Sequence, residues 1–363
     1  MQAAVLRGPE AITMEEVTLN GPEIGEVLVR VVACGVCHSD LHTIKRAQAG
    51  PLPVPVILGH EVAGVVEAVG PGVTSVAEGD HVVVAFKPNC GICYQCVRGA
   101  PQLCEQPDYP HRAATGASPR LLGSDGKPIQ QGIGVAGYSQ YTVMPERGVV
   151  KVRKDAPLDR ICLVGCGVTT GVGAAVRTAR VEPGSDVAVI GLGGVGLNVV
   201  QGARLAGARK IIGVDTVASK ADLGAKFGMT DFVNAAEVDP IAEVQRIAGG
   251  YLDYAFEAIG LGKTVEQAFA MVRRGGTAVV VGVVGQDVTV PGIAFLGEKR
   301  LIGSFFGSAK LQSDLPRYVD LYMEGKLNLD DLVSKKRPMN EINEAFADME
   351  AGKVARSVME PVG

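Results

Sequence analysis

The sequence predicts an α/β protein with a β-rich domain followed by a doubly wound parallel sheet. The chain has 363 residues, which is longer than one ordinary domain. Its first 160 residues or so contain short apolar runs separated by turn residues, a pattern typical of strands. From about Gly167 apolar strands alternate with helical segments, a pattern typical of a parallel sheet buried on both faces.

The elements follow this order along the chain. The β-rich part has its clearest strands at residues 26–34, 62–70 and 80–86. In the alternating part we expect helices at 167–181, 195–207, 219–228, 241–249 and 263–274, and strands at 185–191, 210–215, 231–234, 253–260 and 276–284. After about Phe305 the pattern is mixed and largely helical, as in 315–325 and 342–352, and it resembles neither half.

Composition and charge exclude several classes of protein. Apolar residues make up 47% of the chain and charged residues 20%, which predicts a globular protein with a substantial core. The net charge of −4 provides no basic surface for nucleic acid or anionic membrane. No apolar run reaches the roughly 18–20 residues of a membrane span, and the first residues lack the layout of a signal peptide. We therefore expect a cytoplasmic protein with neither a nucleic-acid nor a membrane partner.

Four of the eight cysteines lie within one short stretch, at Cys90, Cys93, Cys96 and Cys104. In a reducing compartment clustered thiols are more often metal ligands or catalysts than disulfides. Each two-residue gap allows a tight turn, and four thiolates complete a tetrahedral Zn²⁺ site without an open position. The spacing therefore favours a closed, structural zinc site, with an iron–sulfur cluster or unligated thiols as alternatives.

A glycine-rich turn follows the strand predicted at 185–191 and begins the next helix. Its residues are Gly191, Gly193, Gly194, Val195 and Gly196. In this context the glycines permit a tight turn and the close approach of a pyrophosphate to a helix N-terminus. Asp215 ends the following strand, 19 residues after Gly196, where a carboxylate can accept hydrogen bonds from ribose hydroxyls and repel a 2′-phosphate. The pattern indicates a dinucleotide site that favours NAD over NADP, and the alternative is a plain strand–helix turn.

A second group of metal-ligating residues is dispersed along the chain at Cys37, His60 and Cys166. Three such ligands allow a zinc site whose fourth position is left to water or substrate, as in catalytic zinc. Isolated residues of these types are more often structural. We interpret Cys34 and Cys162 in that way, as small buried hydrophobic residues.

Together these motifs resemble the zinc-containing alcohol dehydrogenases of the medium-chain dehydrogenase/reductase family, nearly from end to end. The family pattern G-H-E-x2-G-x5-G-x2-V is matched by Gly59, His60, Glu61, Gly64, Gly70 and Val73. The four-cysteine lobe, the G-C-G-x-x-T-G segment at 165–171 and the glycine turn at 191–196 follow in the family's order.

The resemblance implies catalytic roles for particular residues. The catalytic zinc would be held by Cys37, His60 and Cys166, with Glu61 behind it and Asp40 as the partner of His60. Ser39 would hydrogen-bond the substrate oxygen, and His42 would pass the proton onward through the cofactor ribose.

The resemblance also implies residues that contact the cofactor and the substrate. Besides the glycine turn, the cofactor would be contacted by His38, Thr170, Asp215, Lys220, Val283 and Arg356. The substrate pocket would be lined by Phe86, Val283 and Phe305, all of them apolar.

The implied architecture is a GroES-like β-rich catalytic domain at 1–167, with a zinc lobe at about 89–104, completed by 306–363. A Rossmann NAD-binding domain would occupy 168–305. The implied function is reversible hydride transfer between NAD and a primary alcohol or its aldehyde, with a medium-length chain or an aromatic ring, using two Zn²⁺ per chain.

Two other functions remain open. One is oxidation of a glutathione–formaldehyde adduct. The enzymes of that class carry an arginine four residues after the last lobe cysteine, whereas this chain has Asp108. The other is a non-enzymatic zinc-braced NAD sensor, which the complete open-zinc residue set disfavours.

Assembly is predicted by analogy with the same family. The segment 290–307 would form an edge strand at which nucleotide-binding domains of two chains pair, with Lys299 and Arg300 limiting further growth. The polar stretch 105–137 is a long insertion of the kind found in the dimeric branch. We expect a homodimer, with a tetramer as the alternative.

Overall fold

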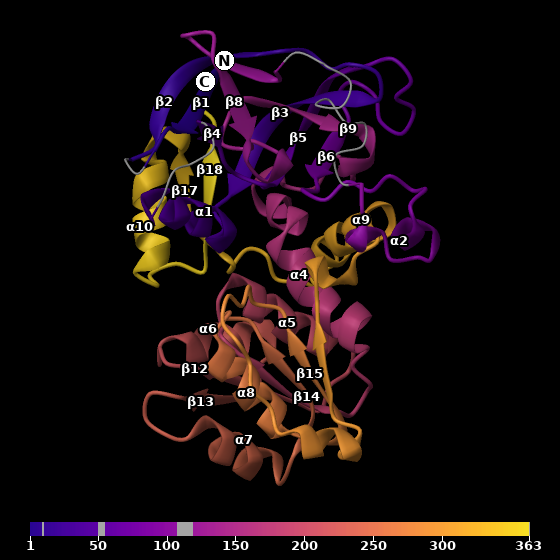
Figure 1. Cartoon of the computed structure of the whole chain (residues 1–363), viewed down its shortest axis with the longest axis vertical. Helices are drawn as coiled ribbons and strands as arrows, with labels where there is room; N and C mark the ends of the chain where they lie inside the picture. The colour runs from indigo at the N-terminus through magenta and orange to yellow at the C-terminus, as the bar shows by residue number, and fades with distance from the viewer. Residues whose placement is uncertain (9–10, 50–54, 107–118, 363) are drawn as a thin grey trace. The chain divides into compact units, whose positions relative to one another are not determined.

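The computed structural model describes residues 1–8, 11–49, 55–106 and 119–362 of the chain (Figure 1). The chain divides into two compact units. Unit 1 comprises Met1–Cys166, Lys310–Glu324 and Leu332–Gly363, and unit 2 comprises Gly167–Ala309 and Gly325–Asp331. The C-terminal part of the chain thus contributes mostly to the unit formed by the N-terminal part, and Asp108 lies outside the described residues.

Unit 1 contains a closed barrel in the order β1-β2-β7-β8-β4. Its strands are β1 (Gln2–Leu6), β2 (Thr13–Leu19), β7 (Leu121–Gly123), β8 (Pro128–Gln131) and β4 (Val56–Ile57). The polar composition of 105–137 gave no indication of β7 and β8. The insertion nevertheless contributes to the barrel because Leu121 and Ile129 are buried in its core.

A seven-stranded sheet forms the rest of the β structure of unit 1, in the order β10-β6-β5-β3-β18-β17, with β9 also paired to β3. Its strands are β10 (Val149–Lys151), β6 (His81–Val84), β5 (Glu61–Val69), β3 (Glu26–Gly35), β18 (Arg356–Glu360), β17 (Val333–Pro338) and β9 (Tyr141–Pro145). Because β18 pairs with the end of β3, with Met359 opposite Cys34, the C-terminal strand belongs to the same sheet as the strand that leads to Cys37.

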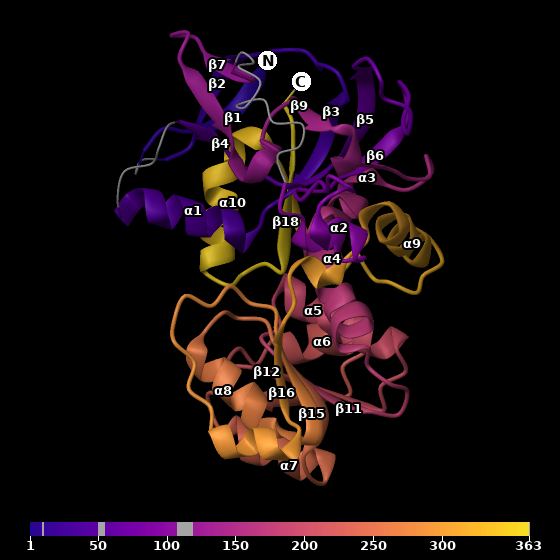
Figure 2. The ribbon, with the colours of Figure 1, turned by 45° about the vertical axis from the view of Figure 1, so that its right-hand side comes forward.

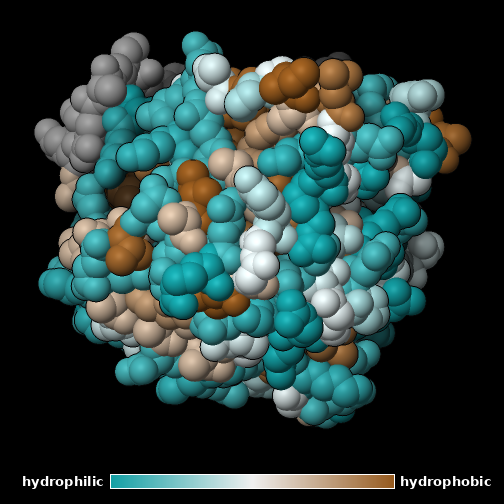
Figure 3. Space-filling view, turned by 90° about the horizontal axis from the view of Figure 1, so that it is seen from below, coloured by the Kyte–Doolittle hydropathy of each residue, from teal (hydrophilic) through white to brown (hydrophobic). Residues whose placement is uncertain are grey.

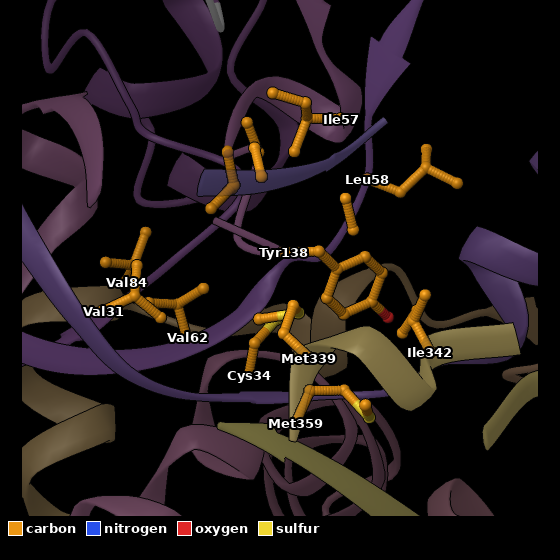
Figure 4. Packing of buried hydrophobic residues seen from close by; sticks show 14 of the residues in the cluster. Val31, Cys34, Ile57, Leu58, Val62, Val84, Tyr138, Met339, Ile342 and Met359 are labelled. Carbon is orange, nitrogen blue, oxygen red and sulfur yellow. The ribbon is translucent and has the colours of Figure 1, made fainter. Parts of the chain in front are cut away.

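The helices of unit 1 are short and flank these strands. They are α1 (His38–Ala49), α2 (Tyr94–Val97), α3 (Leu158–Ile161), α9 (Leu311–Met323) and α10 (Ile342–Glu350). Residues of α10 and β18 share one apolar core with those of β3 and β5, and Figure 4 shows Tyr138 within it, beside Ile342, Met339 and Met359.

Unit 2 contains a six-stranded sheet in the order β13-β12-β11-β14-β15-β16, and every pairing in it is parallel. The strands are β13 (Asp231–Asn234), β12 (Lys210–Asp215), β11 (Asp186–Ile190), β14 (Leu252–Glu257), β15 (Val272–Val280) and β16 (Arg300–Gly303). All five residues of β11 are buried, as expected of a central strand covered on both faces. The predicted doubly wound parallel sheet is therefore confirmed.

In unit 2, helix α4 (Gly167–Gly173) precedes the first strand of the sheet. The crossover helices between strands are α5 (Gly194–Leu205), α6 (Lys220–Phe227), α7 (Pro240–Ala248) and α8 (Gly262–Met271). A π-helical turn at Ala174–Ala179 continues α4. The helix predicted at 263–274 ends earlier than expected because β15 begins at Val272, whose neighbour in the sheet is Leu252. Figure 2 shows β15 and β16 side by side, with α7 and α8 nearby.

The outer surface is mixed in polarity, and the face in Figure 3 is largely hydrophilic with separate hydrophobic patches. One exposed apolar group in unit 2 consists of Ile293, Phe295 and Leu296, in the 3-10 turn Gly292–Gly297 just before β16. Among the described residues, no single helix is long and apolar enough to cross a membrane. One bent pair, Leu158–Gly165 with Gly167–Ala179, meets that test by length and composition, and most of its residues are buried.

Candidate metal and nucleotide sites

Four metal-ligating side chains of unit 1 converge at the ends of its central strands. Cys37 follows β3, Glu61 begins β5 directly after His60, and Cys166 follows a 3-10 turn at Cys162–Gly165. One ligand atom of each residue lies within 4.8 Å of those of the others, and all four residues are buried. The register of β3 and β5 produces this meeting because Gly35 lies opposite Glu61.

The electrostatics of this cluster suit a divalent cation. A hydrogen bond from Cys166 holds the pKa of Cys37 well below that of an ordinary thiol, and His60 adds to the effect. The same hydrogen bond, together with burial, raises the pKa of Cys166 well above its usual value. Cys37 is therefore the thiol of this pair that ionises more readily, and a thiolate is the form that binds a cation. Two thiols, an imidazole and a carboxylate in a buried cluster are the donor set that Zn²⁺ prefers, so the residues fit that metal.

Asp40, in the first turn of α1, is the hydrogen-bond partner of His60. Its Oδ1 lies 3.2 Å from His60 Nδ1 and accepts the N–H of Gly59 at 3.1 Å. Burial disfavours a charged imidazole, but Asp40 and Cys37 outweigh it, and the pKa of His60 is raised well above its usual value. A carboxylate on Nδ1 leaves Nε2 for a metal, which is the usual arrangement of a zinc-bound histidine.

Within the cluster, the buried side chain of Glu61 faces that of Arg356, the first residue of β18. Arg356 Nη2 lies 3.7 Å from Glu61 Oε1. Burial raises the pKa of Glu61 to about 8, although Arg356 opposes the shift. Arg356 is only 3% exposed in unit 1. Sequence reasoning assigned it a cofactor contact and missed this ion pair, which joins residues far apart along the chain.

The four-cysteine lobe forms a second cluster around α2. The sulfurs of Cys90, Cys93, Cys96 and Cys104 lie within 4.8 Å of one another. Backbone N–H groups point at them: those of Ile92 and Cys93 at Cys90 Sγ (3.5 and 3.3 Å), and those of Cys90 and Gln106 at Cys104 Sγ (3.3 and 3.4 Å). Hydrogen bonds of this kind stabilise thiolates, so the lobe fits a closed tetrahedral zinc site.

In unit 2 the glycine turn lies between β11 and α5. Gly191 has φ +93°, and a Cβ on Gly196 would lie 1.7 Å from the carbonyl oxygen of Gly191, so no side chain fits there. Gly193 is the N-cap of α5, whose first turn contains Gly194, Val195 and Gly196. The turn therefore presents free N–H groups at a helix N-terminus, as a phosphate-binding turn does.

Asp215 ends β12 beside this turn. Its Oδ2 accepts the N–H of Leu192 at 2.9 Å and the ammonium of Lys220 at 2.8 Å, and its Oδ1 accepts the N–H of Val217 at 3.1 Å. One carboxylate oxygen thus connects the backbone of the glycine turn to the ammonium group of Lys220.

The remaining predicted site residues belong to different units. In unit 1, Ser39 Oγ lies 3.7 Å from Cys37 Sγ, and His38 and His42 are exposed on α1. The ring of Phe86 makes an edge contact with that of His60, with 5.5 Å between centroids. Three further residues, Thr170, Val283 and Phe305, belong to unit 2. Their predicted contacts with substrate and cofactor stay predictions.

A barrel-and-sheet domain with two zinc-type clusters, followed along the chain by a parallel sheet with a glycine-rich turn, is the combination found in zinc-dependent dehydrogenases. Residues 23–154 match the alcohol dehydrogenase GroES-like domain, and residues 194–324 match the zinc-binding dehydrogenase domain. The chain belongs to the zinc-containing alcohol dehydrogenase family of the medium-chain dehydrogenase/reductase superfamily, and it is a zinc-dependent alcohol dehydrogenase.

Individual relatives cover nearly the whole chain. The chain is 41% identical to an alcohol dehydrogenase class-3 of Cereibacter sphaeroides and 40% identical to an S-(hydroxymethyl)glutathione dehydrogenase of Paracoccus denitrificans, with 98% of each chain covered in both cases. Among solved structures, it superposes on benzyl alcohol dehydrogenase from Acinetobacter calcoaceticus with a TM-score of 0.90 at 33% identity and 99% coverage of both chains. A zinc-binding dehydrogenase of Sinorhizobium meliloti, solved bound to NADP, gives a TM-score of 0.81 at 26% identity and the same coverage.

Proposed function

We propose that the protein interconverts primary alcohols and their aldehydes by hydride transfer to and from NAD, and that its preferred alcohols are of medium length or carry an aromatic ring. The observation that carries this proposal is the buried cluster of Cys37, His60, Glu61 and Cys166 with an aromatic ring, Phe86, against His60. Apolar walls next to a metal suit an uncharged alcohol with a hydrophobic body. The benzyl alcohol dehydrogenase fold match supports an aromatic substrate.

Zinc, when bound, would supply Lewis-acid chemistry that makes the alcohol proton easier to remove. The residues of α1 provide a route for that proton. Ser39 lies at the cluster, 3.7 Å from Cys37 Sγ, and can accept the proton while it donates its own. His42 is three residues further along α1, on the same side of the helix, and it is exposed to solvent. We infer that Ser39 and His42 are the two residues of this chain that take part in moving the proton from the cluster towards water.

NAD is the cofactor that Asp215 favours. Its carboxylate would accept the ribose hydroxyls of NAD, whereas a 2′-phosphate would meet a negative charge. Lys220, which pairs with Asp215 at 2.8 Å, offsets part of that charge. Because one relative is bound to NADP, membership of the family does not determine the preference between NAD and NADP, and the preference is to be measured for this chain.

A second candidate is oxidation of S-(hydroxymethyl)glutathione, because a relative 40% identical to this chain carries that name. The residue that argues against it is Asp108, which would repel an anionic substrate and lies outside the described residues. The two activities differ in what they demand of the pocket: one needs apolar walls, and the other needs a cation for glutathione carboxylates.

A substrate panel separates the two candidates. The rate of NAD reduction would be measured with ethanol, hexanol, benzyl alcohol and a formaldehyde–glutathione mixture, with Cys37→Ser as the inactive control. We expect kcat/KM for benzyl alcohol or hexanol to exceed that for the glutathione adduct by at least about tenfold, the range expected of a few apolar contacts. A clear preference for the adduct would transfer the assignment to the second candidate.

A homodimer formed through the edge of unit 2 completes the proposal. β16 is an edge strand of the six-stranded sheet, and the turn before it exposes Ile293, Phe295 and Leu296. An unpaired strand edge beside exposed apolar side chains is a surface that a second copy can cover. A tetramer remains the alternative assembly.

A further inference from the structure

The buried tyrosine of unit 1, Tyr138, is connected to the candidate zinc site through Asp40. Tyr138 is fully buried, and Figure 4 shows its ring packed beside Ile342, Met339 and Met359. Its hydroxyl is the one polar atom on an otherwise apolar side chain. It donates to Asp40 Oδ2 at 3.0 Å, and the carbonyl oxygen of Gly35 lies 3.3 Å away.

Asp40 is bonded on both of its carboxylate oxygens. Oδ1 faces the N–H of Gly59 (3.1 Å) and Nδ1 of His60 (3.2 Å), while Oδ2 faces Tyr138. A carboxylate held at one oxygen can still rotate about its terminal bond, whereas one held at both is fixed in its plane. The Tyr138 hydroxyl therefore determines the direction from which Oδ1 meets the imidazole.

The backbone and the ring of Tyr138 also support the segment that carries His60. The N–H of Tyr138 donates to the carbonyl of Leu58 at 2.9 Å, and that of Gly137 donates to the carbonyl of Gly59 at 2.8 Å. Gly59 has φ +90°, and a Cβ there would lie 2.7 Å from Tyr138 Cδ1. The turn before His60 thus lies directly on the tyrosine ring.

We propose that Tyr138 is a positioning residue for the zinc ligand His60 and that it acts through Asp40. The inference rests on His60 as a metal ligand and is independent of which alcohol is the substrate. Groups that orient a ligating histidine typically change metal affinity by 10–100-fold when they are removed. Since Tyr138 is one hydrogen bond further from the metal than Asp40, we expect roughly 3–10-fold for its hydroxyl. Burial and the neighbouring Asp40 raise the pKa of Tyr138 well above its usual value, so the phenol remains a donor.

The test compares Tyr138→Phe with a neighbouring control. Tyr138→Phe keeps the ring under Gly59 and removes only the oxygen. Ser139→Ala also removes a buried hydroxyl, but that hydroxyl donates to the carbonyl of Ala136 at 2.7 Å and not to Asp40. Both variants are purified as full-length holoprotein. Loss of the two zinc ions to a chelator is followed with time, and the visible spectrum is recorded after replacement of the catalytic zinc by Co²⁺.

We expect Tyr138→Phe to release its catalytic zinc about 3–10-fold more readily and to shift the Co²⁺ spectrum, while the four-cysteine zinc is unaffected. Ser139→Ala should match the wild type in both measurements even if its melting temperature falls. A Tyr138→Phe protein with normal zinc release and a normal Co²⁺ spectrum would show that the tyrosine is only a core residue, and would overturn the proposal.

A double-mutant cycle with Asp40→Asn tests the route. If Tyr138 acts through Asp40, removing its hydroxyl should have little further effect on zinc release in the Asp40→Asn protein. Additive effects would refute action through Asp40.

If Tyr138→Phe fails to fold, wild-type protein labelled with ¹³Cζ-tyrosine answers the same question. One tyrosine signal should shift when the catalytic zinc is stripped, and unchanged tyrosine signals would overturn the proposal.

Discussion

Replacing Asp215 by Ser should change cofactor choice, and the structure shows why two effects combine. The substitution removes the negative charge that would face a 2′-phosphate. It also releases Lys220, whose ammonium now lies 2.8 Å from Asp215 Oδ2, so that a cation becomes available to the phosphate. A third effect is common to both cofactors, because the N–H of Leu192 in the glycine turn loses its acceptor.

The magnitude follows from the charges. A 2′-phosphate carries a charge of about −1.5 to −2 at pH 7. At about 5 Å and an effective dielectric constant of about 20, its repulsion by a carboxylate is roughly 5–7 kcal/mol. The paired Lys220 offsets about half of this, which leaves about 3 kcal/mol, or roughly a hundredfold preference for NAD. Loss of the Leu192 acceptor should cost both cofactors about 1 kcal/mol.

The assay is kcat/KM for NAD and for NADP with one alcohol at saturation. The wild type should prefer NAD by about a hundredfold or more, and Asp215→Ser should reduce this ratio by roughly 100–1,000-fold, mainly through improved use of NADP. Asp231→Asn is the matched control, since it removes the same charge from the first residue of the adjacent strand β13, at the opposite end of the parallel pair. A ratio unchanged in Asp215→Ser, or a native preference for NADP, would refute the reasoning.

Three further predictions concern metals, pH and assembly. Elemental analysis should find two zinc ions per chain. Cys37→Ser should abolish turnover in a folded protein, whereas Cys93→Ser should reduce stability because an incomplete thiolate cage remains; identical behaviour of the two variants would contradict separate roles. In chelated protein, burial raises the pKa of Glu61 to about 8 from its usual 4.5. The melting temperature of the wild type should therefore fall relative to that of Glu61→Gln as the pH rises from about 4.5 to 8. Melting temperatures that change in parallel in the two proteins would contradict this pH dependence. Light scattering should give the mass of two chains; a mass of four would indicate the tetramer, and a mass of one would exclude pairing at β16.

The parts of the fold that could be predicted from the sequence are those whose signals are local. The glycine turn at 191–196 and the strand–helix alternation around it follow from short-range periodicity and backbone sterics, and the parallel sheet appears as expected. The four-cysteine spacing is equally local, and the four sulfurs do meet. The strands β7 and β8 were not predicted, because each is only three or four residues long. They pair with each other, but their other partners, β2 and β4, lie far away in sequence.

In the catalytic cluster, the metal ligands could be predicted from the sequence, but the contacts of Tyr138 and Arg356 could not. Cys37, His60 and Cys166 could be nominated because few residue types bind zinc, so chemistry alone narrows the choice. The groups that orient the ligands are not restricted in this way. At position 138 phenylalanine would fit the apolar core as well as tyrosine does. Only the hydrogen bond to Asp40, 98 residues earlier in the chain, explains the hydroxyl group. Arg356 is similar, because its partner Glu61 becomes a neighbour only once β18 has paired with β3 and β3 with β5. Ligands are thus determined by their own chemistry, whereas positioning groups are determined by tertiary contacts, and it is among buried polar side chains such as Tyr138 that the structure adds most to the sequence.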